Sequence, residues 1–231
     1  WSWSRGLGDV YKRQNMSIRD NILNIKDEIG DKAKLVVVSK TRSTEEINDA
    51  YNSGHKIFGE NRVQEIVEKQ KLLPDDIEWH MIGHLQKNKV KYIAGFIKLI
   101  HSLDRISLAK EIDRQAKKED RIIDCLIQIK ISKEDSKFGL KIEDFTDFYK
   151  NMETFKNINI IGLMGMATFT SDIKVIGEEF KMIKRIYDNV ASIDPKFRVL
   201  SIGMSDDYNI AIENGSTMIR VGSKIFGKRN Y

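Results

Sequence analysis

Apolar residues along the chain alternate between two spacings. Short apolar runs, typical of buried parallel strands, are followed by stretches in which apolar residues recur every three or four positions, as on one face of a helix. Ile18, Ile22, Ile25 and Ile29 have the helical spacing and predict the first helix. Strands are predicted at 35–39, 56–59, 78–83, 98–102, 122–131, 158–167, 199–203 and 217–221. Helices are predicted after them at 43–54, 61–73, 86–94, 105–118, 142–152, 173–190 and 205–214.

These repeated strand–helix units indicate a single α/β domain. Their connections are short enough for compact βα units, and eight of them predict a TIM-like (β/α)8 barrel over residues 16–231. A doubly wound open sheet has the same pattern and is the alternative. Residues 1–15 have no apolar period, and Met16 looks like the natural start. We therefore expect a non-native or disordered N-terminal extension at 1–15.

Composition narrows the function classes. The 231 residues are 41% hydrophobic and 32% charged, as in ordinary soluble proteins. A net charge of +5, without a concentrated basic face, argues against nucleic-acid binding. No apolar run is long enough to span a membrane. Cys125 is the single cysteine, so no internal disulfide forms, which fits a cytoplasmic location. Helices with charged outer faces favour a monomer.

Lys40 follows the first predicted strand directly. Lysines often end buried strands only to reach water, which is the ordinary interpretation of Lys40 alone. In a (β/α)8 barrel, however, functional groups lie at the carboxyl ends of the strands. Side chains alternate along a strand, so Val36, Val38 and Lys40 share one face. If that face points inward, Lys40 projects into the barrel mouth, where its amine can form a Schiff base with an aldehyde.

The last strand carries an arginine among apolar residues. Met218, Arg220 and Gly222 share one face of this strand. A buried arginine needs a partner, so Arg220 is predicted either to contact a ligand at the mouth or to form a structural ion pair with an acid on a neighbouring strand. Strands 1 and 8 become neighbours when a barrel closes. Arg220 and Lys40 are therefore expected at one pocket.

The segments after strands 7 and 8 are candidates for phosphate binding. Gly203, Met204 and Ser205 lead into the predicted helix 205–214, whose first N–H groups could bind an anion. Ser205 as an ordinary helix N-cap is the alternative. Asp206 and Asp207 are expected to point away from a phosphate.

After strand 8, Gly222 permits close approach of the backbone and Ser223 follows it. A lysine, a phosphate cradle and a cation together describe a site for pyridoxal 5'-phosphate (PLP). No metal site is expected, because His80 and His84 would lie about 13 Å apart on a strand.

Six segments resemble the pyridoxal-phosphate homeostasis protein family of the YggS/PROSC type. They are VVSKT at 37–41, FGEN at 58–61, WHMIGHLQ at 79–86, GLM at 162–164, LSIGMSDD at 200–207 and GSTMIRVG at 215–222. The resemblance implies a barrel like the N-terminal domain of alanine racemase, the type III PLP fold. It also implies that Lys40 carries PLP and that Arg220 approaches the pyridine nitrogen.

The same resemblance supplies the remaining site residues. It implies that Ser205, Gly222 and Ser223 hold the phosphate beside Met204, and that Asn61 and His80 line the pocket. Arg42 stands where many relatives have lysine, so the resemblance does not extend a role in cofactor transfer to this position.

We expect a PLP carrier rather than an enzyme. An arginine beside the pyridine nitrogen favours the unprotonated ring, which stabilises a carbanion poorly. The barrel leaves no room for a second domain like the one that supplies the opposite base in alanine racemases. The predicted function is intracellular storage, buffering or delivery of PLP, with PLP-dependent apo-enzymes as recipients. A small PLP-dependent racemase or decarboxylase is the main alternative, and a Schiff-base aldolase is another.

Overall fold

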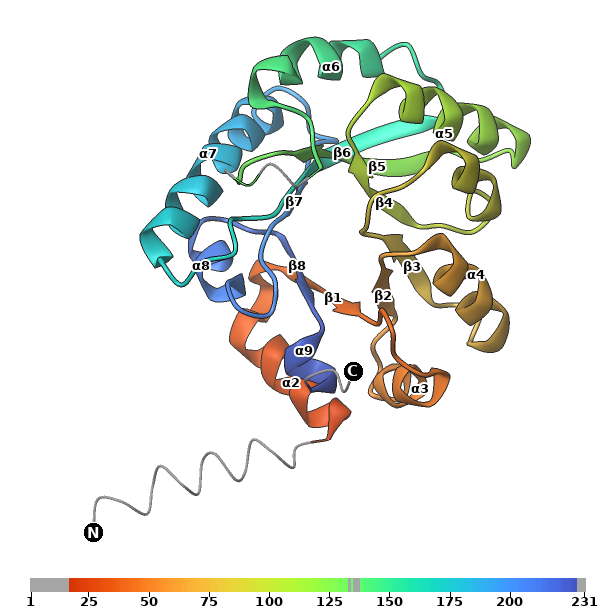
Figure 1. Cartoon of the computed structure of the whole chain (residues 1–231), viewed down its shortest axis with the longest axis vertical. Coiled ribbons are helices and arrows are strands. Elements are labelled where there is room, and N and C mark those ends of the chain that lie inside the picture. Colours follow the sequence, from red (N-terminus) through yellow and green to blue (C-terminus); the bar gives the residue numbers. More distant parts are fainter. Residues whose placement is uncertain (1–16, 133, 135–137, 228–231) are drawn as a thin grey trace.

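The computed structural model describes residues 17–132, 134 and 138–227, so the expectation for residues 1–15 lies outside the described part. Eight parallel strands close into a barrel in sequence order (Figure 1). The closing pair is β1 with β8, in which Val36 lies beside Arg220. This pairing confirms the predicted (β/α)8 barrel. The alternative of an open sheet is wrong, because an open sheet would leave both edge strands unpaired.

The strands are short and mostly buried. They are β1 (Lys34–Val38), β2 (Ile57–Glu60), β3 (Glu78–Met81), β4 (Leu99–Leu103), β5 (Ile123–Ile129), β6 (Ile158–Gly165), β7 (Val199–Ser201) and β8 (Met218–Val221). The register shifts by one residue between β5 and β6 near Cys125, and Gly162 of β6 lies against the backbone of Val199. A Cβ at Gly162 would lie 1.7 Å from the Val199 carbonyl oxygen, so only glycine fits there.

Helices surround the barrel. They are α2 (Ile18–Ile29), η1 (Gly30–Lys32), α3 (Thr44–Asn52), α4 (Val63–Leu72), η2 (Lys87–Tyr92), α5 (Ile106–Lys118), η3 (Ile142–Asp144), α6 (Phe145–Met152), α7 (Ile173–Ala191), α8 (Tyr208–Glu213) and α9 (Ser223–Phe226). Ser43 and Glu46 form a capping box that starts α3 immediately after the Lys40 turn. Within the described residues, no helix is both long and apolar enough to cross a membrane.

Two helices differ from the predictions. The segment predicted as a helix at 86–94 is the 3-10 helix η2. The helix predicted at 205–214 begins only at Tyr208, because residues 204–207 form a turn in which an Asp207 oxygen accepts a hydrogen bond from the Met204 N–H at 2.5 Å. Ser205 is therefore not the N-cap of α8; Asp207 holds that position.

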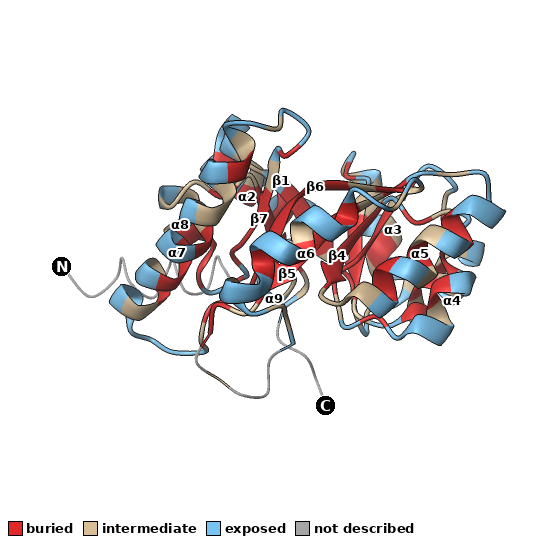
Figure 2. Ribbon diagram, turned by 90° about the horizontal axis from the view of Figure 1, so that it is seen from above, coloured by how far each residue is buried: buried red, intermediate tan, exposed pale blue. Residues whose placement is uncertain are grey.

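The alternation of side chains along the strands divides the core into two layers. Val36 and Met218 face the barrel interior with Leu99, Leu126, Ile161 and Met164. Their neighbours Val37 and Ile219 pack outward with residues of the surrounding helices. Figure 2 shows the buried strands at the centre and the exposed outer faces of the helices. The face of strand 1 that carries Val36 and the face of strand 8 that carries Met218 and Arg220 therefore both point inward.

Candidate functional site at the barrel mouth

A cavity of about 410 Å³ opens at the carboxyl ends of the strands. Seven of the eight residues predicted to bind the cofactor line it: Lys40, Asn61, Met204, Ser205, Arg220, Gly222 and Ser223. They come from segments that follow β1, β2, β7 and β8, or from β8 itself. The closed barrel brings these segments to one end of the molecule, as the sequence predicted.

His80 is the exception. It lies on the inward face of β3, pairs with Gly59 and Leu99, and is only 3% exposed. Ile82, two residues further along the chain, lines the mouth cavity instead. Two residues of strand correspond to about 7 Å, so His80 is buried below the mouth. The prediction that His80 lines the cofactor pocket does not agree with this placement.

Lys40 stands two residues beyond the last residue of β1, half-buried at the cavity wall. The next residue, Thr41, has a left-handed backbone with φ of +63°. Such a conformation is costly for a threonine and persists only where the surroundings hold it. Thr41 is held by its N–H, which donates to Glu65 Oε2 at 2.7 Å.

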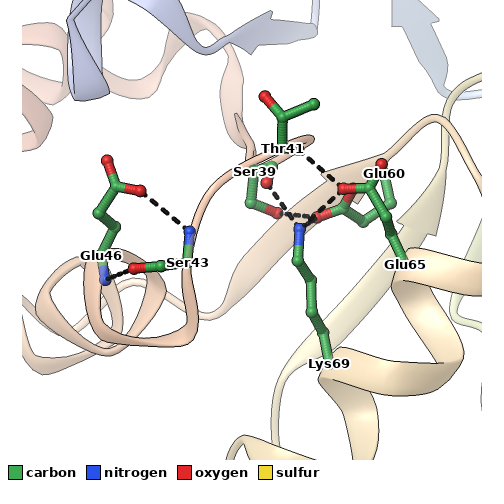
Figure 3. A network of polar contacts seen from close by, with 7 residues as sticks. All are labelled: Ser39, Thr41, Ser43, Glu46, Glu60, Glu65 and Lys69. Atoms are coloured by element: carbon green, nitrogen blue, oxygen red, sulfur yellow. Dashed lines mark hydrogen bonds and ion pairs between the residues drawn. The ribbon is translucent and has the colours of Figure 1, made fainter. Parts of the chain in front are cut away.

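A buried polar cluster fixes the chain on both sides of Lys40 (Figure 3). The Ser39 hydroxyl donates to Glu60 Oε1 at 2.6 Å, and Lys69 Nζ donates to the Ser39 carbonyl at 2.9 Å. Lys69 also pairs with Glu60 at 2.7 Å and with Glu65 at 3.0 Å. We call Ser39, Glu60, Glu65 and Lys69 the strand-end clamp. It holds the backbone on either side of Lys40.

Burial and the neighbouring polar groups shift the pKa of Glu60 in opposite directions. Glu60 is fully buried on the outward face of β2, where it meets α4. Burial raises the pKa of Glu60 to about 7, and the neighbouring Lys69 ammonium and Ser39 hydroxyl oppose this rise. Its second oxygen, Oε2, has no hydrogen-bond partner among the described residues. The clamp is therefore sensitive to pH near neutrality.

Arg220 crosses the interior beneath the cavity. Nη1 donates to the carbonyl and hydroxyl oxygens of Ser201 at 2.8 and 2.6 Å, and Nη2 donates to the Gly165 carbonyl at 3.0 Å. Burial lowers the pKa of Arg220 to about 10, while the charge of Asp207 opposes this shift. No carboxylate lies within ion-pair distance of Arg220 in the described part of the chain. The predicted structural ion pair is therefore replaced by backbone and hydroxyl acceptors.

The segments after β7 and β8 meet at the cavity wall. The Gly222 N–H donates to Ser205 Oγ at 3.2 Å, which joins the two segments. A Cβ at Gly222 would lie 3.0 Å from the Val38 carbonyl oxygen, so glycine allows β1 and β8 to approach closely here. The Asp207 carboxylate accepts a hydrogen bond from the Met204 N–H and does not line the cavity, as expected, but Asp206 does line it. The expectation that both aspartates avoid the cavity is thus correct only for Asp207.

Arg42 also reaches the cavity and has defined partners. Its guanidinium donates to Glu46 at 3.1 Å and to the Gly227 carbonyl at 2.6 Å, and it lies 5.3 Å from the Phe226 ring centre. These contacts tie the turn after β1 to the chain beyond β8. Arg42 is therefore a structural link across the closing strands as well as a cation at the cavity rim.

Other residues that line the cavity were not predicted as cofactor-binding residues from the sequence. They are Val38, Ile82, Gly83, His84, Gln128, Phe138, Met166, Phe169 and Asp206. The His84 and Phe138 rings stack with their centres 3.8 Å apart, and Phe169 is 87% exposed. Among the described residues, no group of three or more His, Cys, Asp or Glu side chains could hold a metal ion.

Comparison with known proteins identifies the family of this chain. Residues 15–230 match the model of the alanine racemase N-terminal domain. The chain is 39% identical over 201 residues to the pyridoxal phosphate homeostasis protein of Aquifex aeolicus, covering 86% of this chain and 88% of the relative. It is 33% identical over 228 residues to the Escherichia coli protein of that name, covering 93% and 97% of the two chains.

Solved structures agree with this assignment. PipY of Synechococcus elongatus has been solved without PLP and with PLP bound. The PLP-bound form superposes with a TM-score of 0.83 at 30% identity and covers 91% of this chain and 100% of PipY. Alanine racemase of Bartonella henselae, at 15% identity and a TM-score of 0.70, shares the fold over 60% of its length. The chain belongs to the pyridoxal phosphate homeostasis protein family, which is built on the alanine racemase N-terminal domain.

Proposed function

We propose that this chain binds PLP in the mouth cavity and holds it as a Schiff base on Lys40, for storage, buffering or delivery. One observation carries the proposal. Lys40, Arg220 and the Ser205–Gly222 junction, three features with separate chemistry, lie on the wall of a single cavity. The PLP bound to the relative PipY supports the same ligand here.

The covalent step needs only groups that the chain and the cofactor supply. The Lys40 amine, in its unprotonated form, adds to the aldehyde carbon of PLP. A carbon–nitrogen double bond forms, and the aldehyde oxygen leaves as water after taking up the two protons of the amine. No oxidant or reductant takes part. The strand-end clamp serves this step by fixing the backbone from which the Lys40 side chain projects.

The cavity wall fits the rest of the cofactor. Because Ser205 Oγ accepts the Gly222 N–H, the Ser205 proton remains available to donate to a phosphate oxygen. Ser223 adds a second hydroxyl on the same wall. The Arg220 guanidinium offers only donors, and a donor beside the pyridine nitrogen favours the unprotonated ring. When bound, PLP would therefore supply a reactive aldehyde but only a weak electron sink.

A catalytic alternative rests on His84. This histidine lines the mouth cavity, and its Nδ1 lies 3.9 Å from Asp104. Its imidazole could therefore move a proton in a small PLP-dependent racemase or decarboxylase. Exchange of the α-proton of an amino acid in deuterated water would identify that activity. A carrier gives no exchange across a broad panel of amino acids.

Absorbance titration with PLP tests the proposal. The wild type should gain a visible band that sodium borohydride removes, and the Lys40→Ala variant should gain none. Lys71→Ala is the matched control, because Lys71 is exposed on α4 and does not line the cavity. A borohydride-sensitive band that persists in Lys40→Ala would refute the role of Lys40. Absence of any band beyond that of free PLP in the wild type would refute the Schiff base.

Three further expectations complete the proposal. Delivery requires recipients, for which PLP-dependent apo-enzymes are the natural class. The single cysteine, which is buried and free, suits a cytoplasmic location. A monomer is expected, and sedimentation of the purified protein would test this.

A further inference from the structure

A second cavity, of about 600 Å³, lies at the other end of the barrel. Its lining includes the amino ends of the strands, so we call it the amino-end cavity. Apolar side chains of the barrel interior line part of it: Ile57, Leu99, Ile161, Val199 and Met218. Charged side chains also line it: Asp31, Lys32, Lys34, Glu78, Lys98, Asp124 and Arg198. The proposed PLP site uses none of these residues.

A buried hydrogen-bond chain joins the two ends of the barrel. It begins at Arg220 Nη1, which lies 2.6 Å from Ser201 Oγ. Ser201 Oγ lies 3.1 Å from His101 Nδ1, and His101 Nε2 lies 3.0 Å from His80 Nδ1. Arg220 lines the mouth cavity, and His80 lines the amino-end cavity. All four side chains are buried.

Arg220 determines which atom donates and which accepts at each step of this hydrogen-bond chain. A guanidinium only donates, so Ser201 Oγ accepts from Arg220. Among the described residues, the Ser201 hydroxyl has no acceptor other than His101 Nδ1, and an unsatisfied buried donor is costly. The Ser201 proton therefore goes to His101 Nδ1. Burial lowers the pKa of His101 well below its usual value, so His101 is neutral and carries its one proton on Nε2.

The same reasoning determines which ring nitrogen of His80 carries the proton. Burial lowers the pKa of His80 to about 3, so this ring is also neutral. Because Nδ1 accepts from His101, the His80 proton lies on Nε2. This N–H group has no partner in the described part of the chain, although His80 is only 3% exposed and lines the amino-end cavity. The side chain is otherwise enclosed, so this N–H is the group that His80 presents to the cavity, where an acceptor that enters can bind it.

The surrounding charges favour an acceptor that is negative. The positive charges of Lys98 and Lys34 both act on His80. Arg198 adds a third cation to the lining. Three carboxylates, Asp31, Glu78 and Asp124, oppose these cations. With Lys32 the lining carries four cations against three carboxylates, which leaves a net charge of 4 − 3 = +1.

We propose that the amino-end cavity is a second ligand site, which takes a small oxyanion bearing a carboxylate or phosphate group. One oxygen of the anion accepts the His80 Nε2–H, and Lys34, Lys98 and Arg198 balance its charge. The site does not depend on the proposed binding of PLP at the mouth, because its residues are separate from those of the mouth cavity.

Histidine NMR tests this site with inorganic phosphate as the probe. The chain has four histidines, so nitrogen-15 labelling of histidine gives few signals. His80 reports on the amino-end cavity and His84 on the mouth, where phosphate can also bind; His84→Gln identifies the mouth signal. We expect the His80 proton on Nε2, and a saturable shift of this signal when phosphate is added at fixed pH and ionic strength.

Two variants of exposed lysines make the test specific. Lys98→Ala should weaken the phosphate response of His80 by about threefold, the loss typical of one exposed ionic contact, without changing that of His84. Lys117→Ala on α5 is the matched control and should leave both responses unchanged. A His80 proton on Nδ1, a His80 signal unaffected by phosphate, or an equal response in Lys98→Ala and wild type would each overturn the proposal.

Discussion

Replacing Lys69 by methionine tests whether the strand-end clamp stabilises the chain around Lys40. Methionine keeps an unbranched apolar side chain at this position but removes the ammonium group. The change deletes the contacts of Lys69 with Glu60, with Glu65 and with the Ser39 carbonyl. Glu60 is left buried with neither oxygen paired to a cation.

The expected loss is large and depends on pH. Breaking one partner of a buried ion pair costs about 3–5 kcal/mol of unfolding free energy, which we expect near pH 8. In the wild type, the pKa of Glu60 is raised from 4.5 to about 7. The stability contributed by this raised pKa is full below pH 4.5 and is lost as the pH rises through 7. At about pH 5.5 Glu60 is mostly protonated, so the loss of Lys69 should cost less there.

Urea unfolding of the variant and the wild type at about pH 5.5 and about pH 8 measures this difference. Removing Lys69 should raise the pKa of Glu60 further, and a rise of one unit, from about 7 to about 8, adds about 1.4 kcal/mol to the difference between the two pH values. A larger rise adds no more, because the titration of Glu60 then lies above the higher pH. Lys71→Met is the matched control, because Lys71 lies on the exposed face of the same helix. The double variant Lys69→Met with Glu60→Gln should recover part of the loss, since it removes the buried charge.

Two results would refute this reasoning. A loss below about 1 kcal/mol near pH 8 would show that the pair behaves like an exposed salt bridge. An equal loss at both pH values would show that the titration of Glu60 does not contribute to the stability of the clamp.

Three other substitutions probe the mouth and the interior. Gly83→Ala would place a Cβ 2.4 Å from the backbone oxygen of Asn61, so we expect Asn61 to move and the PLP affinity in an absorbance titration to fall. Ser201→Ala removes the hydroxyl between Arg220 and His101 and should lower the unfolding free energy, measured in urea, by about 1–3 kcal/mol. An unchanged unfolding free energy would contradict the buried hydrogen-bond chain. Gly222→Ala would place a Cβ 3.0 Å from the last carbonyl of β1, so PLP affinity should fall while the fold is retained, as circular dichroism would show.

Local sequence patterns predicted the barrel and the faces of its strands. The two-residue period of a strand is a local property, so the spacing showed which residues share a face with Val36 and with Arg220. The structure then showed that these faces point inward. Closure of the barrel then placed Arg220 and Lys40 at one cavity. These placements follow from the two-residue period of a strand and from the rule that the first and last strands pair when a barrel closes.

Features that depend on packing between distant segments could not be predicted. Lys69 looks like any lysine on a polar helix face, and its burial appears only where α4 meets β2. The family resemblance placed His80 at the pocket, but β3 continues beyond it to Met81, and Ile82 lines the mouth cavity instead. Ser205 was expected to start a helix, but Asp207 bonds the Met204 N–H and delays the start of α8.

The most direct test of the central claim is to identify the lysine that carries PLP. The protein is saturated with PLP, reduced with borohydride, digested and analysed by mass spectrometry. We expect one pyridoxyl-phosphate group, on the peptide that contains Lys40, and none on this peptide when reduction is omitted. Modification of other lysines with Lys40 left free would contradict the proposed site, and the absence of any modified peptide would contradict covalent binding itself.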